Sequence, residues 1–170
     1  MQINSDDKFW IPDQELKILQ ALNRFAAEYL IFGGYAMLFY GFYDRDINDL
    51  DIWISNEEEN AEKVYKAFQL ITDIRLQFTE SDLKLPNKKI RLPSHMYEVE
   101  LFTSVKGPTF SDAYSSKSVA VYNGHSLFII SSTHLLEIKT TSLYEAKERL
   151  RKETIDIAFL RKQHNKRMNS

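Results

Sequence analysis

Hydrophobic and polar residues follow two periods along this chain, and the two periods alternate. Apolar positions at helical spacing predict a first helix over about 13–28, with an apolar face made of Leu16, Leu19, Leu22 and Phe25. Similar patterns predict helices over about 56–70, 133–140 and 144–163, and a short one from 36 to about 40. Apolar or alternating runs predict strands over 29–32, 50–55, 88–92, 97–105, 118–122 and 127–130.

Turns and caps separate several of these elements. Asn123-Gly124, between the last two strands, is typical of a two-residue hairpin turn. Gly33-Gly34 directly follows an apolar strand and predicts a tight turn before the short helix. Ser55 or Asn56 is expected to cap the helix that follows the strand at 50–55. The mixed order of elements predicts an α/β (α+β) fold, a small mixed sheet flanked by helices, with further helices at the C-terminus.

Composition changes this picture only slightly. The chain has 170 residues, 44% of them hydrophobic, which suits one domain with a core over about 13–130 and a helical part over about 131–165. It has no cysteine, so disulfides and thiolate metal sites are excluded. The net charge of −2 identifies no partner. Without a signal peptide pattern or a long apolar run, we expect a soluble cytoplasmic protein with no membrane partner.

Candidate chemistry begins with a close pair of acids. Asp49 and Asp51 lie two apart at the start of a strand, so their side chains share one face, about 7 Å apart along the backbone. Two carboxylates this close repel each other unless a cation lies between them, and Mg²⁺ prefers such oxygen ligands. Alone, the pair would more often be a solvated strand edge. The Gly33-Gly34 turn raises its significance, because glycine lets the backbone approach a phosphate closely.

A third acid would complete a two-metal site for phosphoryl transfer. Glu98 and Glu100 lie two apart on the strand at 97–105, so both are expected on one face. Glu98 reads more readily as a solvated strand position. Glu100 lies between Val99 and Leu101 in an apolar strand, which favours a functional role.

These residues resemble a known family. The segment IFGGYAMLFYGFYDRDINDLDIWI is similar to the minimal nucleotidyltransferases of the DNA polymerase β superfamily, and most similar to a bacterial branch that includes AbiEii-like toxins. Their pattern is a hydrophobic strand, Gly-Gly or Gly-Ser, Asp-x-Asp on the next strand and a later single acid. The resemblance spans about 29–160. It implies the nucleotidyltransferase fold, an NTP substrate such as ATP, and Mg²⁺ or Mn²⁺ as cofactor.

The resemblance also assigns roles to residues of this chain. It implies that three acids bind the metals and that one of them positions or deprotonates the acceptor: Asp49, Asp51 and Glu100. It implies that Lys139 stabilises charge in catalysis, with Asp156 as its partner. The expected nucleotide-binding residues are Gly33, Gly34, Tyr35, Arg45 and Asp156.

Three positions depart from the family pattern. Gly34 replaces a serine that many active members use to hold a phosphate, Glu100 replaces the commoner aspartate, and Ile47 stands where relatives often have threonine. None of these changes removes a carboxylate, so we expect an active enzyme. The glutamate has a longer arm than aspartate, and the geometry of the metal site would differ accordingly.

The resemblance leaves the acceptor open. It implies transfer of a nucleoside monophosphate to an RNA (tRNA) or protein hydroxyl, within a toxin–antitoxin or phage-defence pair. Two alternatives remain: a catalytically silent domain that binds nucleotide or a partner protein, and an antitoxin that adds AMP to its cognate toxin. The basic stretches at 84–91 and 147–167 suit either an RNA backbone or solvent.

Overall fold

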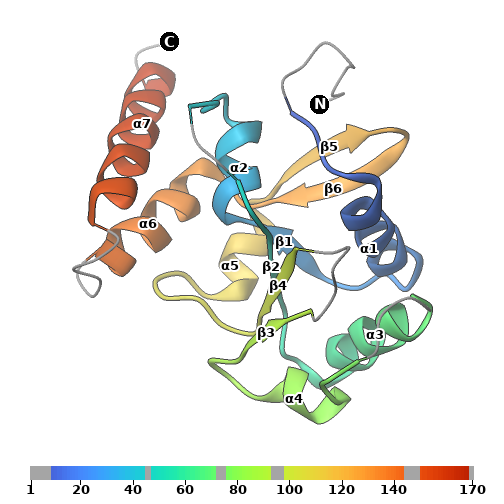
Figure 1. Cartoon of the computed structure of the whole chain (residues 1–170). Coiled ribbons are helices and arrows are strands. Elements are labelled where there is room, and N and C mark those ends of the chain that lie inside the picture. The colour runs from blue at the N-terminus through green and yellow to red at the C-terminus, as the bar shows by residue number, and fades with distance from the viewer. Residues whose placement is uncertain (1–8, 45–46, 72–75, 93–97, 144–149, 169–170) are drawn as a thin grey trace.

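The computed structural model describes residues 9–44, 47–71, 76–92, 98–143 and 150–168, and these contain a six-stranded sheet (Figure 1). Its strands are β1 (Tyr29–Ile31), β2 (Leu50–Ile54), β3 (Lys89–Arg91), β4 (Val99–Phe102), β5 (Ser118–Tyr122) and β6 (His125–Ile129). The helices of the described residues are α1 (Asp13–Arg24), α2 (Gly33–Phe39), α3 (Glu58–Gln69), α4 (Glu80–Lys84), α5 (Phe110–Ser115), α6 (Ser132–Leu143) and α7 (Leu150–Met168). The predicted mixed sheet flanked by helices is therefore confirmed.

The sheet order β3-β4-β2-β1-β6-β5 mixes both strand directions. β2 pairs antiparallel with β1 and parallel with β4, while β3 pairs antiparallel with β4 at one edge. At the other edge β5 and β6 form the hairpin that Asn123-Gly124 predicts. In Figure 1, α6 and α7 lie on one side of β2 and β4, and α1 and α3 lie on the other.

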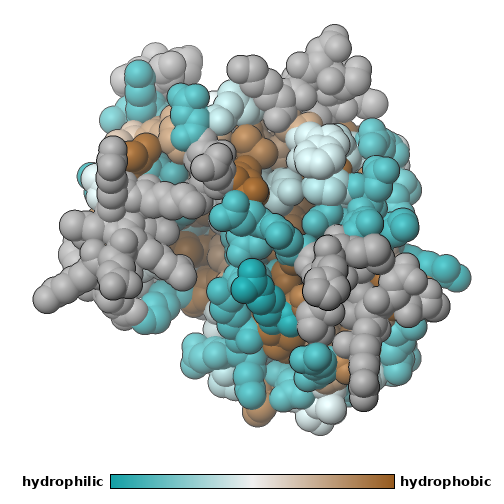
Figure 2. All heavy atoms as spheres, in the orientation of Figure 1, coloured by the Kyte–Doolittle hydropathy of each residue, from teal (hydrophilic) through white to brown (hydrophobic). Residues whose placement is uncertain are grey.

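Helices on both sides explain why the central strands are buried on both faces. All three residues of β1 are buried, and so is Trp53 on β2, at 2% exposure. The Trp53 ring packs edge-on against Phe110 of α5, with the ring centroids 5.2 Å apart. Two-sided burial is typical of central strands in mixed sheets, which carry continuous apolar runs. In the same orientation, the face in Figure 2 is mainly hydrophilic, with apolar residues set back between the polar ones.

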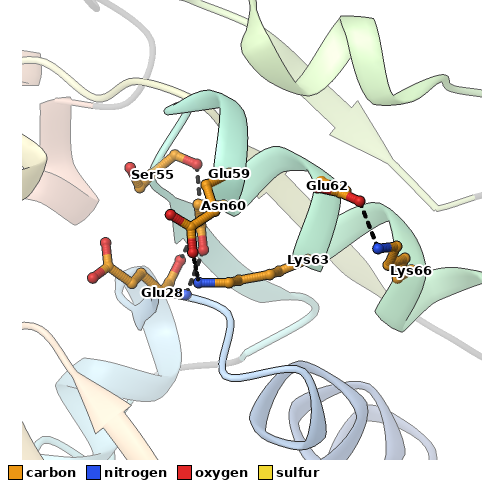
Figure 3. A network of polar contacts seen from close by, with 7 residues as sticks. All are labelled: Glu28, Ser55, Glu59, Asn60, Glu62, Lys63 and Lys66. Atoms are coloured by element: carbon orange, nitrogen blue, oxygen red, sulfur yellow. Dashed lines mark hydrogen bonds and ion pairs between the residues drawn. The ribbon is translucent and has the colours of Figure 1, made fainter.

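Asn60 of α3 joins the beginning of β1 to the end of β2 (Figure 3). Its amide accepts a hydrogen bond from the Glu28 N–H at 2.6 Å and donates to the Glu28 and Ser55 carbonyls at 3.0 and 2.8 Å. Asn60 is 4% exposed, so its buried amide is satisfied by these three backbone groups. This link holds β1 and β2 in register, and the Phe32 N–H donates to the Asp51 carbonyl farther along the same pair.

Several predicted boundaries were wrong. The first helix ends at Arg24 instead of about 28, because Ala26 takes a left-handed backbone with φ of 51°. The short helix begins at Gly33, so the glycines form its first turn instead of a separate turn. Neither Ser55 nor Asn56 caps α3: the cap residue is Glu57, without a side-chain cap bond. The short helices α4 and α5 were not predicted.

The C-terminal helices confirm the predicted helical end of the chain. α6 and α7 pack against each other, and residues 144–149 between them lie outside the described part. Within the described residues, no helix combines the length and apolar character that crossing a membrane requires.

Candidate metal centre

Three carboxylates meet where β2 and β4 run side by side. Asp49 immediately precedes β2, Asp51 is the second residue of β2, and Glu100 is the second residue of β4. The parallel register places Asp51 directly beside Glu100. One carboxylate oxygen of each residue lies within 4.8 Å of the others. The structure therefore brings together the acids that sequence analysis selected.

Burial and mutual repulsion make this cluster unfavourable without a cation. The pKa of Asp51 is raised from 3.8 to about 7, first by burial and then by the negative charges of Asp49 and Glu100. The positive charges of Lys89 and Lys139 act in the opposite direction. A bound divalent cation would lower the pKa of Asp51 again, because it favours the ionised carboxylates.

Gly33 gives the cluster its space. Its φ of +62° lies in the left-handed region, which residues with a side chain rarely adopt. A methyl group placed on Gly33 would overlap the Asp51 carboxylate. Gly34 is less constrained: a Cβ there would lie 3.1 Å from the nearest atom of Ile47. Gly33 is thus required next to Asp51 for both its backbone conformation and its missing side chain.

Glu100 also contacts two cationic side chains of β3. Lys89 Nζ lies 2.6 Å from Glu100 Oε2, and Arg91 Nε lies 3.9 Å from Glu100 Oε1. Arg91 is opposite Glu100 in the antiparallel register, and Lys89 lies on the same strand face two residues away. The Glu100 side chain is 7% exposed, so these contacts partly compensate its buried charge. Neither Lys89 nor Arg91 was among the residues predicted for the site.

Lys139 and Asp156 form a buried ion pair between α6 and α7. Lys139 Nζ lies 2.7 Å from Asp156 Oδ2, and the two side chains are 7% and 2% exposed. This pairing agrees with the partnership that the resemblance implies. The positive charge of Lys139 lowers the pKa of Asp51, so the ion pair acts electrostatically on the carboxylate cluster.

Tyr35 of α2 lies beside a second set of acids. Its pKa is raised to about 12, first by burial and then by the negative charges of Glu15, Glu98 and Asp49. Glu15 is 6% exposed and accepts a hydrogen bond from the Glu98 N–H at 3.4 Å. Within the described residues, Glu15 Oε2 has no hydrogen-bond partner. The charge of Asp49 thus acts on Tyr35, which the resemblance assigns to nucleotide binding.

Glu98 and Arg45 are the remaining positions that were considered from the sequence. Glu98 is exposed just before β4, in agreement with a solvated position, while Glu100 is buried. Arg45, an expected nucleotide-binding residue, lies outside the described residues. Two residues near the site were not predicted from the sequence: Lys89, which contacts Glu100, and Glu15, whose charge acts on Tyr35. The sequence Lys-Lys-Ile-Arg at 88–91 marks a basic strand, but only the strand order shows which carboxylate it faces.

The donor set fits a hard divalent cation. All three side chains offer carboxylate oxygens, which are the ligands that Mg²⁺ and Mn²⁺ prefer. Zn²⁺ sites are more often built from sulfur and imidazole ligands. Burial first, and then the charges of Asp49 and Glu100, raise the pKa of Asp51, and a bound cation would favour the ionised carboxylates. These residues could therefore hold a metal ion, and Asp49 and Asp51 remain partly exposed.

Comparisons with known proteins find similar structures but no similar sequence family. Neither a protein-family model nor a curated protein sequence matches this chain. Its structure is similar to an antigenic nucleotidyltransferase-like protein from Paracoccidioides brasiliensis, with 20% identity, a TM-score of 0.58, and coverage of 88% of this chain and 77% of that one. A candidate nucleotidyltransferase from Thermotoga maritima is 18% identical, with a TM-score of 0.49 and coverage of 95% and 99%. The similarity to the first of these structures shows that the chain has the nucleotidyltransferase fold.

Proposed function

We propose that this protein is a Mg²⁺-dependent nucleotidyltransferase that moves a nucleoside monophosphate from an NTP to a hydroxyl group. The observation that carries the proposal is the meeting of Asp49, Asp51 and Glu100 beside Gly33. Within the nucleotidyltransferase fold, this arrangement offers oxygen ligands for metal and an open backbone for phosphate. Bound divalent metal would supply charge stabilisation for the phosphoryl group and its leaving group.

The reaction exchanges one phosphorus–oxygen bond for another. The acceptor hydroxyl oxygen forms a bond to the α-phosphorus, the bond from the α-phosphorus to the β-bridging oxygen breaks, and pyrophosphate leaves with that electron pair. In this proposal Asp49, Asp51 and Glu100 hold the metals, and Glu100 also orients the acceptor hydroxyl or takes its proton. The backbone at Gly33 and Gly34 approaches the triphosphate.

The buried ion pair has a supporting role in this proposal. Lys139 is held by Asp156 and contributes positive charge on the side of Asp51. In the transition state, negative charge spreads over the transferred phosphoryl group, and a fixed ammonium nearby stabilises it. In this proposal Tyr35, whose pKa is raised in part by the charge of Asp49, lines the nucleotide pocket.

The acceptor is an RNA end, such as that of a tRNA, or a protein hydroxyl. The resemblance to the AbiEii-like branch supports a place in a toxin–antitoxin or phage-defence pair. An antitoxin that transfers AMP to its cognate toxin would use the same chemistry with a protein acceptor. A catalytically silent domain would keep the nucleotide site and lose turnover.

Label transfer distinguishes these outcomes. The protein is incubated with α-³²P-labelled NTPs, Mg²⁺, total RNA and a lysate from the source cells, beside the variant Asp49→Ala/Asp51→Ala. The proposal expects metal-dependent label on an RNA or a protein, absent with the double variant. Label on protein alone favours the AMP-transferring antitoxin. NTP binding without transfer identifies the silent domain, and the absence of both binding and transfer refutes the proposal.

A further inference from the structure

Lys89, at the edge of the sheet, contacts the carboxylate that the proposed function assigns to metal. Its Nζ atom lies 2.6 Å from Glu100 Oε2, while Arg91 Nε lies 3.9 Å from Glu100 Oε1. Both oxygens of Glu100 therefore face cationic groups from the same strand. Since Lys89 also acts electrostatically on Asp51, its charge lies close to the whole carboxylate cluster.

The two members of this ion pair differ in freedom. The Glu100 side chain is 7% exposed, whereas the Lys89 side chain is 48% exposed on a strand at the sheet edge. A long lysine side chain anchored at an edge can move into solvent, but a buried glutamate on a central strand cannot follow it. Lys89 Nζ also lies 5.3 Å from the centroid of the Phe102 ring, whose face offers the ammonium a second contact.

A divalent metal would compete with this lysine. Mg²⁺ binds carboxylate oxygens at about 2.1 Å, so a metal on Glu100 would lie within a few ångströms of the ammonium. Two cations at this separation repel each other strongly in a partly buried site. Metal binding therefore favours a lysine position away from Glu100. The displaced ammonium stays tethered beside the metal, where the phosphate oxygens of an NTP would lie, and ammonium groups bind phosphates well.

We propose that Lys89 exchanges partners during the reaction cycle: it is the counter-ion of Glu100 in the metal-free protein and contacts the triphosphate of the NTP once metal is bound. The proposal rests on the proposed function, because it takes Glu100 as a metal ligand. It gives β3, which carries no residue of the predicted site, a direct part in substrate binding.

The test measures metal and phosphate binding separately, in the full chain. Lys89→Met removes the ammonium and keeps much of the side-chain volume. Lys88→Met is the matched control, since Lys88 is the preceding residue, is similarly exposed at 45%, and pairs with Asp82 instead of Glu100. Mn²⁺ binding alone is followed by electron paramagnetic resonance. Binding of tripolyphosphate at saturating Mg²⁺ is followed by calorimetry, which avoids any dependence on the base.

The expected effects have opposite signs. Lys89→Met binds Mn²⁺ roughly three- to tenfold more tightly than the wild type, because the competing cation is gone, and binds tripolyphosphate roughly three- to tenfold more weakly. Lys88→Met changes neither affinity by more than about twofold. If Lys89→Met lowers the melting temperature in EDTA, Lys89→Gln is measured as well and must show the same two signs.

Four results overturn the inference. Weaker binding of both ligands by Lys89→Met would mean that the lysine only supports the structure. Equal effects of the two lysine variants would mean that only net charge matters. A wild type that binds neither Mn²⁺ nor tripolyphosphate removes this inference together with the proposed function, whereas nucleotidyl transfer with no specific effect at Lys89 removes this inference alone.

Discussion

Replacing Asp51 with asparagine should stabilise the metal-free protein at alkaline pH. Asparagine has nearly the same shape as aspartate and carries no charge, so it relieves both the burial of charge and the repulsion within the cluster. The pKa of Asp51 rises from 3.8 to about 7 on folding, which corresponds to about 4 kcal/mol in favour of the protonated form. Asp51 keeps some exposure, and solvent screening reduces this to about 2 kcal/mol.

The pH dependence of the effect follows from proton linkage. Between about pH 4 and pH 7 the folded protein holds a proton on Asp51 that the unfolded chain has lost, so the free energy of unfolding of the wild type falls as the pH rises. Above about pH 7 both states are ionised and the full penalty persists. Asp51→Asn removes this penalty, and its advantage over the wild type should shrink to below about 1 kcal/mol at pH 5.

Thermal unfolding in EDTA, followed by circular dichroism, measures the effect. At pH 8.5 an advantage of about 2 kcal/mol corresponds to a melting temperature about 4–8 °C above that of the wild type. Asp13→Asn, at an exposed position in α1, is the control for charge removal and should change little. Mg²⁺ should raise the melting temperature of the wild type and not that of Asp51→Asn. An Asp51→Asn protein no more stable than the wild type at pH 8.5, or an advantage independent of pH, would refute the reasoning.

Three further variants test the surroundings of the site. Gly33→Ala should lower the melting temperature more than Gly124→Ala, because both glycines have positive φ but only the first methyl group meets a carboxylate; equal effects would contradict this. Asn60→Ala should lower the free energy of unfolding in urea by about 2–4 kcal/mol, since backbone groups lose buried partners, and a loss under about 1 kcal/mol would count against it. Lys139→Met should lower the free energy of unfolding by about 3 kcal/mol at neutral pH, because it removes the ammonium that pairs with the buried Asp156 carboxylate. Lys139→Met/Asp156→Leu removes that carboxylate as well and should recover much of the loss.

The sequence predicted those parts of the fold that depend on local periodicity. The β5–β6 hairpin follows from alternating residues around Asn123-Gly124, and β1 from an apolar run before the glycines. The short helices α4 and α5 were not predicted, because segments of five or six residues show too little hydrophobic periodicity. Each begins after a threonine with an aspartate three residues later, Thr79 with Asp82 and Thr109 with Asp112, so the capping signature was present in the sequence.

The candidate site was predictable only in part, because it depends on the order of strands in the sheet as well as on local spacing. Asp49 immediately precedes β2 and Asp51 lies on it, so their proximity follows from spacing along the chain. Their meeting with Glu100 depends on β4 being the parallel neighbour of β2, which no local pattern specifies. The same holds for Lys89, whose partner depends on β3 pairing with β4. Strand order is determined by packing over the whole sheet, and for that reason it has to be observed.

The central claim is that the carboxylates of β2 and β4 hold divalent metal beside a nucleotide. The most direct measurement is a crystal structure with Mn²⁺ and a non-hydrolysable NTP analogue, in which anomalous scattering locates the metal. The account predicts a Mn²⁺ peak bounded by Asp49, Asp51 and Glu100, with the triphosphate next to Gly33. A nucleotide bound elsewhere, or no anomalous peak among these carboxylates at a saturating Mn²⁺ concentration, would contradict it.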